Sequence, residues 1–320
     1  MRRRGFAPFG RKAFTLVELL VVIAIVTILI AILLPVLSGA RRRFVVLASP
    51  IAYVGEDGAL YLVSPDGSHE LRLTEAGLYV DSFPGLEAPV QWSPCGRRLG
   101  FNASDGSSGW TVFIEPLNGQ TWRFLGQRFG GFVDYDTWIE TGAWWHTLRS
   151  VETGKVLGRF SLPDAEHFDT FAPAPPTTDG AFVASWHGDI RPCIGLVKKD
   201  YQPGRPIYTW PAEMAGMHFH VNPQIDPLGE WAGWQSPAGG PDVFVRGMRE
   251  SPTAPLISIG HYTFCDWTED SRVLVNGYQG DGLAPGLAVL RVDGSLVRRV
   301  RTEVPPLSGS LAAYRKFGHR

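Results

Sequence analysis

The sequence predicts an all-β protein, a six-bladed β-propeller preceded by one N-terminal transmembrane α-helix. Three observations predict this. An apolar run at residues 14–37 follows a basic leader, short apolar strands separated by turn residues fill the rest of the chain, and related strand–turn–strand units recur about every forty residues. The composition agrees, because 37 Gly, 25 Pro and 12% aromatic residues in a chain of 320 residues suit turns and strands.

Charge and cysteine content exclude several classes of protein. The formal net charge of -1 gives no reason to expect nucleic acid as a partner. The three cysteines, Cys95, Cys193 and Cys265, are an odd number and form no Cys-x-x-Cys pair, so neither a zinc site nor a disulfide framework is indicated. We expect buried free thiols, and a single bridge is the alternative.

The N-terminal segment predicts a single-pass membrane protein. Residues 1–13 form a basic leader with five basic residues and no acid. Leu19 to Leu37 would measure about 28 Å as a helix, enough to cross the hydrocarbon core of a bilayer. Positive charge is denser before the run than after it, where Arg41–Arg43 follow, so the leader is predicted in the cytoplasm and the C-terminal bulk outside it.

Glu18 is unusual, because a carboxylate inside a membrane-spanning helix is costly and indicates a function. The sequence KAFTLVELLVVIAI at residues 12–25 resembles the processing motif of type IV pilins and type II secretion pseudopilins. The resemblance implies that prepilin peptidase cuts between Ala13 and Phe14, that Phe14 is then N-methylated, and that Glu18 pairs with the N-terminal amine of another pilin-like subunit. The family usually has Gly before the cut, and this chain has Ala13.

Two ordinary explanations of the apolar run compete with the pilin-like one. The run could be an uncleaved signal anchor, or a signal peptide cut after Ser38-Gly39-Ala40. A signal peptide has an apolar core of roughly 7–15 residues without an acid, whereas this run is longer and contains Glu18. The pilin-like interpretation is therefore preferred.

The exported region contains repeated units. The first type is a strand, a tight turn and a second strand, seen at residues 90–101, 225–234 and 265–275, and more weakly at 176–184. The second type is a hairpin with Asp-Gly or Asn-Gly at its turn, seen at residues 60–67, 112–119 and 290–294, and more loosely at 148–154. Together they make a four-stranded unit. Six copies are expected near residues 45–74, 90–125, 132–161, 168–210, 223–259 and 265–301.

The turn Trp92-Ser93-Pro94-Cys95-Gly96 with a downstream Asn-Gly resembles the TolB-type, WD40-like propeller repeats. A β-sandwich or two small β domains are the alternatives. We expect a propeller at residues 44–305, after a helix at residues 14–43, and a C-terminal tail at residues 306–320. Either Phe44–Leu47, as a strand, or Leu311–Arg315 is expected to close the ring.

Catalytic motifs are scarce, since the sequence has no Gly-rich phosphate loop, no Gly-x-Ser-x-Gly turn and no His-Glu-x-x-His motif. His218, His220 and His261 are candidate ligands of a divalent metal, with His187 nearby in the repeats. The pair His218-x-His220 resembles a ligand pair of oligogalacturonate lyases, which are propellers with a catalytic metal. Histidines satisfied by hydrogen bonds or exposed to solvent are the preferred explanation.

Two further groups have an ordinary interpretation beside a functional one. Asp134-Tyr135-Asp136 could bind calcium, but turn chemistry is favoured. The segment Trp138 to Trp145 could stack on sugars, but packing between blades is favoured.

These observations predict a pilin-like protein of the inner membrane, held there by residues 14–37, with its propeller outside the cytoplasm, in a pseudopilus or at the cell surface. The propeller would act as a structural module or bind protein or carbohydrate, without a cofactor and without catalysis. The alternative is an anchored, metal-dependent carbohydrate-active enzyme that uses His218, His220 and His261.

Overall fold

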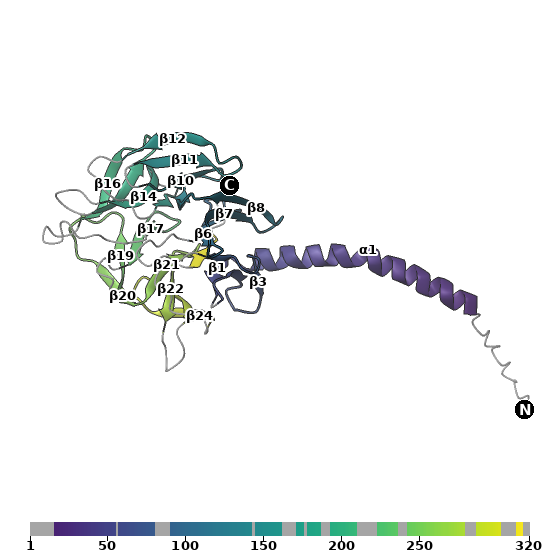
Figure 1. The fold of residues 1–320 in the computed structure, drawn as a ribbon. Helices are drawn as coiled ribbons and strands as arrows, with labels where there is room; N and C mark the ends of the chain where they lie inside the picture. The colour runs from purple at the N-terminus through teal and green to yellow at the C-terminus, as the bar shows by residue number, and fades with distance from the viewer. Residues whose placement is uncertain are drawn as a thin grey trace, which may run out of the picture. The chain divides into compact units, whose positions relative to one another are not determined.

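The computed structural model describes residues 16–55, 57–80, 90–142, 145–161, 171–175, 178–186, 193–209, 223–235, 242–278, 286–301 and 312–315. The chain divides into two compact units, Met1–Phe44 and Val45–Arg320, and each is described by itself (Figure 1).

The N-terminal unit consists of helix α1 (Leu16–Ala48), whose last residues already belong to the second unit. Its segment Leu16–Leu34 has a mean hydropathy of 3.2 and is long and apolar enough to cross a membrane, as the sequence predicts. The expected strand at Phe44–Leu47 is wrong, because these residues continue the helix and Val46 is buried in the propeller core. The sequence has no turn residue between Ala40 and Ser49, and Pro50 then disfavours helix at the residue before it.

The second unit is a six-bladed propeller of antiparallel sheets, and the strands of each blade are named from the innermost outward (Figure 1). Blade 1 contains β25 (Ala312–Tyr314), β1 (Ile51–Val54), β2 (Leu60–Val63) and β3 (Glu70–Arg72). Blade 2 contains β4 (Tyr79–Val80) and β5 (Gln91–Trp92), then β6 (Leu99–Ser104), β7 (Gly109–Glu115) and β8 (Gln120–Leu125). Blade 3 contains β9 (Phe129–Phe132), β10 (Thr137–Glu140), β11 (His146–Ser150) and β12 (Val156–Phe160).

The remaining three blades repeat this order. Blade 4 contains β13 (Phe171–Pro173), β14 (Gly180–Trp186), β15 (Cys193–Lys198) and β16 (Pro203–Thr209). Blade 5 contains β17 (Gln224–Ile225), β18 (Trp231–Gln235), β19 (Asp242–Gly247) and β20 (Ile257–His261). Blade 6 contains β21 (Thr263–Trp267), β22 (Val273–Tyr278), β23 (Gly286–Leu290) and β24 (Leu296–Arg301). The predicted number of six blades is therefore confirmed, although the first predicted copy, residues 45–74, supplies only three of the four strands of blade 1.

The innermost strand of blade 2 has two parts. β4 pairs with residues 103–104 of β6, and β5 pairs with residues 99–100. The other edge of β6 is occupied by β7, so β4 and β5 share one edge of β6 end to end. The sequence did not predict β4, because a two-residue strand carries no periodic signal.

The ring closes through the C-terminal strand. The inner strands contact one another in the order β25, β5, β9, β13, β17, β21 and back to β25. Blade 1 takes β25 from the end of the chain and its other three strands from the beginning, with Tyr314 opposite Ile51. This confirms the expectation that Leu311–Arg315 closes the ring, and it leaves β1 without an open edge.

The turns that join first to second strands and third to fourth strands lie on one side of the ring, which we call the turn face. Two of its glycines pack against the preceding blade. A Cβ on Gly67 would lie 2.7 Å from the carbonyl oxygen of Val300, and one on Gly294 would lie 2.8 Å from that of Ile259. Both glycines also have a positive φ, so a side chain is excluded by the backbone conformation as well as by the adjoining blade.

Candidate functional site

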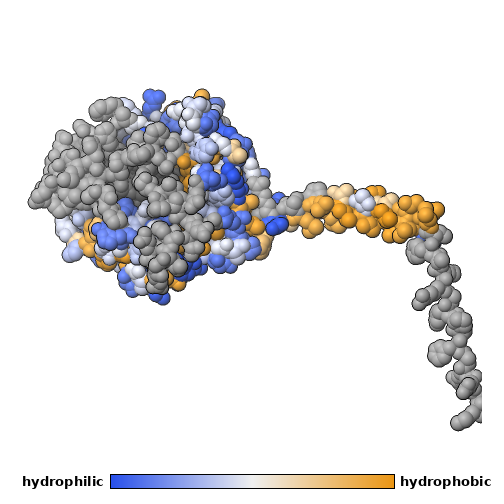
Figure 2. Space-filling view, turned by 60° about the horizontal axis from the view of Figure 1, so that its bottom comes forward, coloured by the Kyte–Doolittle hydropathy of each residue, from blue (hydrophilic) through white to orange (hydrophobic). Residues whose placement is uncertain are grey.

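The first candidate site is the exposed surface of α1. Its apolar side chains from Leu16 to Leu34 are all exposed, and Figure 2 shows them as a continuous apolar surface. In water such a surface would be strongly unfavourable, so it requires lipid or other apolar helices around it. The expected processing site, Ala13 and Phe14, lies outside the described residues.

Glu18 lies in the first turn of α1 and is exposed. The free backbone N–H groups of a first helical turn carry partial positive charge, which favours a carboxylate there. In an apolar surrounding this effect offsets only part of the cost of burying a charge. A cation beside the carboxylate would offset more of this cost.

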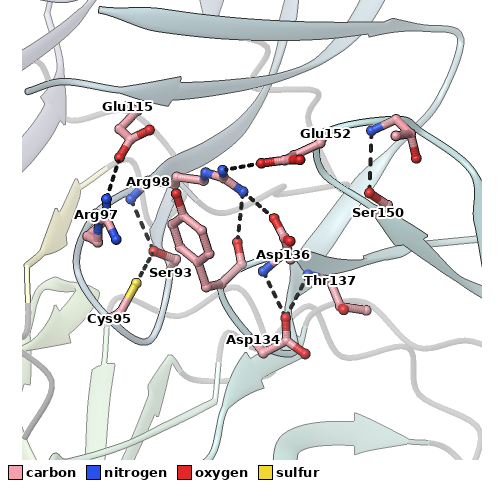
Figure 3. Close-up of polar contacts among 12 residues, drawn as sticks. Ser93, Cys95, Arg97, Arg98, Glu115, Asp134, Asp136, Thr137, Ser150 and Glu152 are labelled. Carbon is pink, nitrogen blue, oxygen red and sulfur yellow. Dashed lines mark hydrogen bonds and ion pairs between the residues drawn. The ribbon is translucent and has the colours of Figure 1, made fainter. Parts of the chain in front are cut away.

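The second candidate site is a cluster around Arg98 on the turn face (Figure 3). The Arg98 side chain is only 2% exposed, and it reaches from blade 2 to two turns of blade 3. Its guanidinium donates to Asp136 at 2.6 Å and to Glu152 at 3.2 Å, and it stacks 3.7 Å from the ring centre of Tyr135. Trp122 of blade 2 covers it from a ring centre 4.6 Å away.

Burial acts to lower the pKa of Arg98, but Asp136, Tyr135 and Glu152 outweigh burial, and the pKa is raised above its ordinary value. The guanidinium is therefore permanently charged and well paired. No reacting group or open space is needed to explain it, so we assign the cluster to holding blades 2 and 3 together.

Within this cluster, the contacts of Asp134 decide between the calcium-binding and the turn interpretation of residues 134–136. Its Oδ1 accepts the backbone N–H groups of Asp136 at 2.8 Å and Thr137 at 2.7 Å, which is turn chemistry. Asp136 is the partner of Arg98. Both carboxylates are thus used within the fold, as the turn interpretation predicts.

The Arg98 cluster makes an asymmetric prediction for stability. The double variant Asp136→Asn with Glu152→Gln should lower the free energy of unfolding by about 2 kcal/mol, because it leaves a buried cation without its anions. Arg98→Met should cost less, because Asp136 and Glu152 are 55% and 57% exposed and regain water. Urea unfolding of the three proteins measures this, and a larger loss for Arg98→Met than for the double variant would contradict it.

Buried glutamine side chains form a further set of hydrogen bonds between blades, which the sequence did not predict. Gln91 of β5 accepts from the N–H of Phe132 at 2.8 Å and donates to the carbonyl of Phe171 at 3.0 Å. Gln224 of β17 occupies the matching place in blade 5 and donates to the carbonyl of Cys265 at 3.0 Å. Both glutamines lie two residues before a Ser-Pro or Asp-Pro turn. The unit at residues 90–101 already contains Gln91, and starting the unit at residues 225–234 one residue further upstream would have shown the match with Gln224.

The predicted metal ligands are only partly described. His261 ends β20, its side chain is 74% exposed, and its Nδ1 lies 2.8 Å from Oδ1 of Asp242. His218, His220 and His187 lie outside the described residues. Among the residues that the structure describes, no three His, Cys, Asp or Glu side chains are grouped to hold a metal.

The aromatic segment and the cysteines divide between core and surface. Trp138 is fully buried between blades 2 and 3, as packing predicts, whereas Trp145 is 60% exposed and Trp144 lies outside the described residues. All three cysteines are free, and Cys193 and Cys265 are buried. The expectation of a buried thiol is wrong for Cys95, because the turn that contains it places its side chain in solvent.

Comparisons with known proteins agree with both units. Residues 9–34 match the family described as "Prokaryotic N-terminal methylation motif". No curated protein sequence matches the chain significantly. The fold is similar to TolB from Acinetobacter baumannii, with a TM-score of 0.60 and 12% identity over 84% of this chain and 67% of that one. It is also similar to a chain of a nidogen–laminin complex, with a TM-score of 0.56 and 8% identity over 83% of this chain and 98% of that one.

Proposed function

We propose that this chain is a pilin-like subunit of the inner membrane that carries a β-propeller on the extracytoplasmic side as a binding or structural module. The observation that carries the proposal is the N-terminal methylation motif of residues 9–34, joined through one helix to a six-bladed propeller. The motif supports processing by prepilin peptidase between Ala13 and Phe14. The helix then supplies location, and the propeller supplies a rigid ring whose loops bind protein or carbohydrate.

Glu18 is the residue through which the subunit would join a pseudopilus or a related assembly. After processing, Glu18 is the fifth residue of the mature chain. Its carboxylate would pair with the N-terminal amine of an adjacent subunit, because a charge-assisted contact between them lowers the cost of placing both charges in the apolar interior.

Processing and assembly are tested together. Mass spectrometry of the native protein should find a mature N-terminus at Phe14 carrying one methyl group. Glu18→Gln should lower incorporation into cross-linked assemblies at least tenfold, since a charge-assisted hydrogen bond contributes about 1.5–3 kcal/mol. Thr27→Val is the matched control, because the Thr27 hydroxyl donates only to the carbonyl of Ile23 in its own helix.

Two results would overturn this part of the proposal. A native chain that retains residues 1–13, or one that begins at Arg41, is incompatible with the processing step. Equal incorporation of Glu18→Gln and Thr27→Val would remove the role of the carboxylate.

The side of the membrane that the propeller occupies can be tested with the native thiols. Cys95 is exposed, whereas burial raises the pKa of Cys193 to about 12 and makes that thiol unreactive. A charged maleimide that does not cross membranes should label intact spheroplasts at one site, and Cys95→Ser should abolish the label. Labelling that appears only after the spheroplasts are lysed would place the propeller in the cytoplasm.

A further inference from the structure

A buried arginine lies between blades 4 and 5 without a counter-ion in the described part of the chain. Arg246 of β19 is 0% exposed, and its neighbours Trp234 and Met248 belong to the apolar cluster that blades 4 and 5 share. Its Nε and Nη2 have no hydrogen-bond partner among the described residues. A guanidinium in such a place is costly, because its charge and its unpaired N–H groups have lost their water.

The unpaired donors of Arg246 form the edge that binds carboxylates. Nε–H and Nη2–H lie on the same edge of the planar guanidinium and match the two oxygens of a carboxylate. Nη1 on the other side donates to the carbonyl of Ala254 at 2.9 Å, which holds the group in place. Trp234 adds a third buried donor without a partner, its Nε1. Both side chains lie beside the ring of Tyr208, whose centre is 5.5 Å from the guanidinium carbon and 5.6 Å from the ring of Trp234.

Arg98 shows the same kind of group with its anions in place. It is also buried against a tyrosine ring, but two carboxylates of blade 3 pair with it, and its pKa is raised. Burial lowers the pKa of Arg246, and Glu250 and Tyr208 offset only part of that effect. Glu250 is exposed, and its carboxylate lies over Gly247, where a Cβ would be 3.1 Å from Oε1. The component that Arg246 lacks is therefore an anion in contact with its free edge.

We propose that Arg246 anchors a binding site for a small molecule that presents a carboxylate, whose two oxygens accept from Nε and Nη2. The edge is closed to solvent, so the ligand enters under the loop of residues 251–256 on the turn face. In the described part of the chain this loop is tied to the rest by two hydrogen bonds, from Arg246 to Ala254 and from the Thr209 N–H to the carbonyl of Pro252 at 3.3 Å. A space under a six-residue loop fits a small molecule and not the surface of a folded protein.

The site is tested by thermal unfolding of the full chain in detergent, with acetate as the probe. At constant ionic strength the midpoint of the wild-type chain should rise with acetate concentration, and acetamide, which has the same shape without the charge, should not raise it. Arg246→Met should remove the response. Arg246→Lys should need about tenfold more acetate for the same shift, because an ammonium group does not present two parallel N–H donors.

Arg98→Met is the matched control, because that arginine already holds its carboxylates, and the variant should keep the wild-type response to acetate. Absence of an acetate-dependent shift in the wild-type chain, or an equal shift in Arg246→Met, would overturn the site.

Midpoints measured without acetate test whether the fold itself supplies the anion. Arg246→Met should raise the midpoint, because it removes a buried charge that has no counter-ion, and Glu250→Gln should leave it unchanged. A midpoint below that of the wild-type chain in either variant would show that Arg246 is already paired, and would overturn the proposal. The inference goes beyond the proposed function and concerns the propeller alone, so its failure leaves processing and assembly untouched.

Discussion

A chain that ends at residue 311 is expected to lose on the order of 4 kcal/mol of its free energy of unfolding, if it folds at all. The truncation removes β25, whose residues Ala312 to Tyr314 pair with Tyr53 to Ile51 of β1. Blade 1 then keeps three strands, and the inner edge of β1 becomes unpaired. Because β25 also contacts the inner strands β21 and β5, the ring opens between blades 6 and 2.

Arg315 adds to this loss. It is 2% exposed, its backbone N–H donates to Pro50 at 2.7 Å, and its Nη2 donates to the carbonyl of Leu47 at 2.8 Å. Its guanidinium also lies 5.4 Å from the ring centre of Trp92 in blade 2. This one buried residue thus connects the closing strand to residues 47–50, which lead into β1, and to blade 2. Each lost hydrogen bond of this kind costs about 1 kcal/mol.

The matched control ends at Arg315 and keeps every one of these contacts. Thermal unfolding of the full chain and both truncations in the same detergent measures the effect. The control should unfold with the full-length protein, and the shorter chain should unfold at a much lower temperature. A similar midpoint for the two truncations would show that β25 does not close the ring.

Much of this fold could be predicted because its turns repeat in the sequence. The units around Trp92-Ser93-Pro94 and Ile225-Asp226-Pro227 mark the start of the second strand in their blades, and the observed turns lie there. The helix was predicted from hydropathy alone. The end of the helix was not predicted, because the sequence of residues 44–47 is as compatible with a strand as with a helix. The burial of Val46 in the propeller core is a tertiary contact that the local sequence does not show.

The ties between blades could not be predicted, because they join residues distant in the sequence. Arg98 and Glu152 are 54 residues apart, and Asp226 and Ser271, whose hydroxyl donates to the carboxylate at 2.5 Å, are 45 apart. The local sequence predicts each turn, but it does not predict which charged side chain of the adjoining blade contacts that turn.

His146 is expected to make the propeller sensitive to mild acid. It begins β11, is 3% exposed, and packs against Phe160 and Phe171 at ring-centre distances of 5.3 and 4.9 Å. Burial lowers its pKa from 6.5 to about 4, because the charged imidazolium is disfavoured among these rings. Below pH 6.5 His146 therefore binds a proton in the unfolded chain but not in the folded chain. The free energy of unfolding falls as the pH is lowered, until about pH 4.

A shift of this size corresponds to about 3 kcal/mol lost across that pH range. Urea unfolding between pH 7 and pH 4 should show the loss in the wild-type chain, and His146→Leu should remove most of it. Asp57, Asp105 and Asp293 have pKa values lowered from 3.8, so their stabilising contributions are lost only at lower pH and do not account for the slope. Leu148→Ala, in the same cluster, is the control, because it should reduce stability equally at every pH. An unchanged slope in His146→Leu would mean that another group binds the proton, and the buried imidazole would then be a packing residue only.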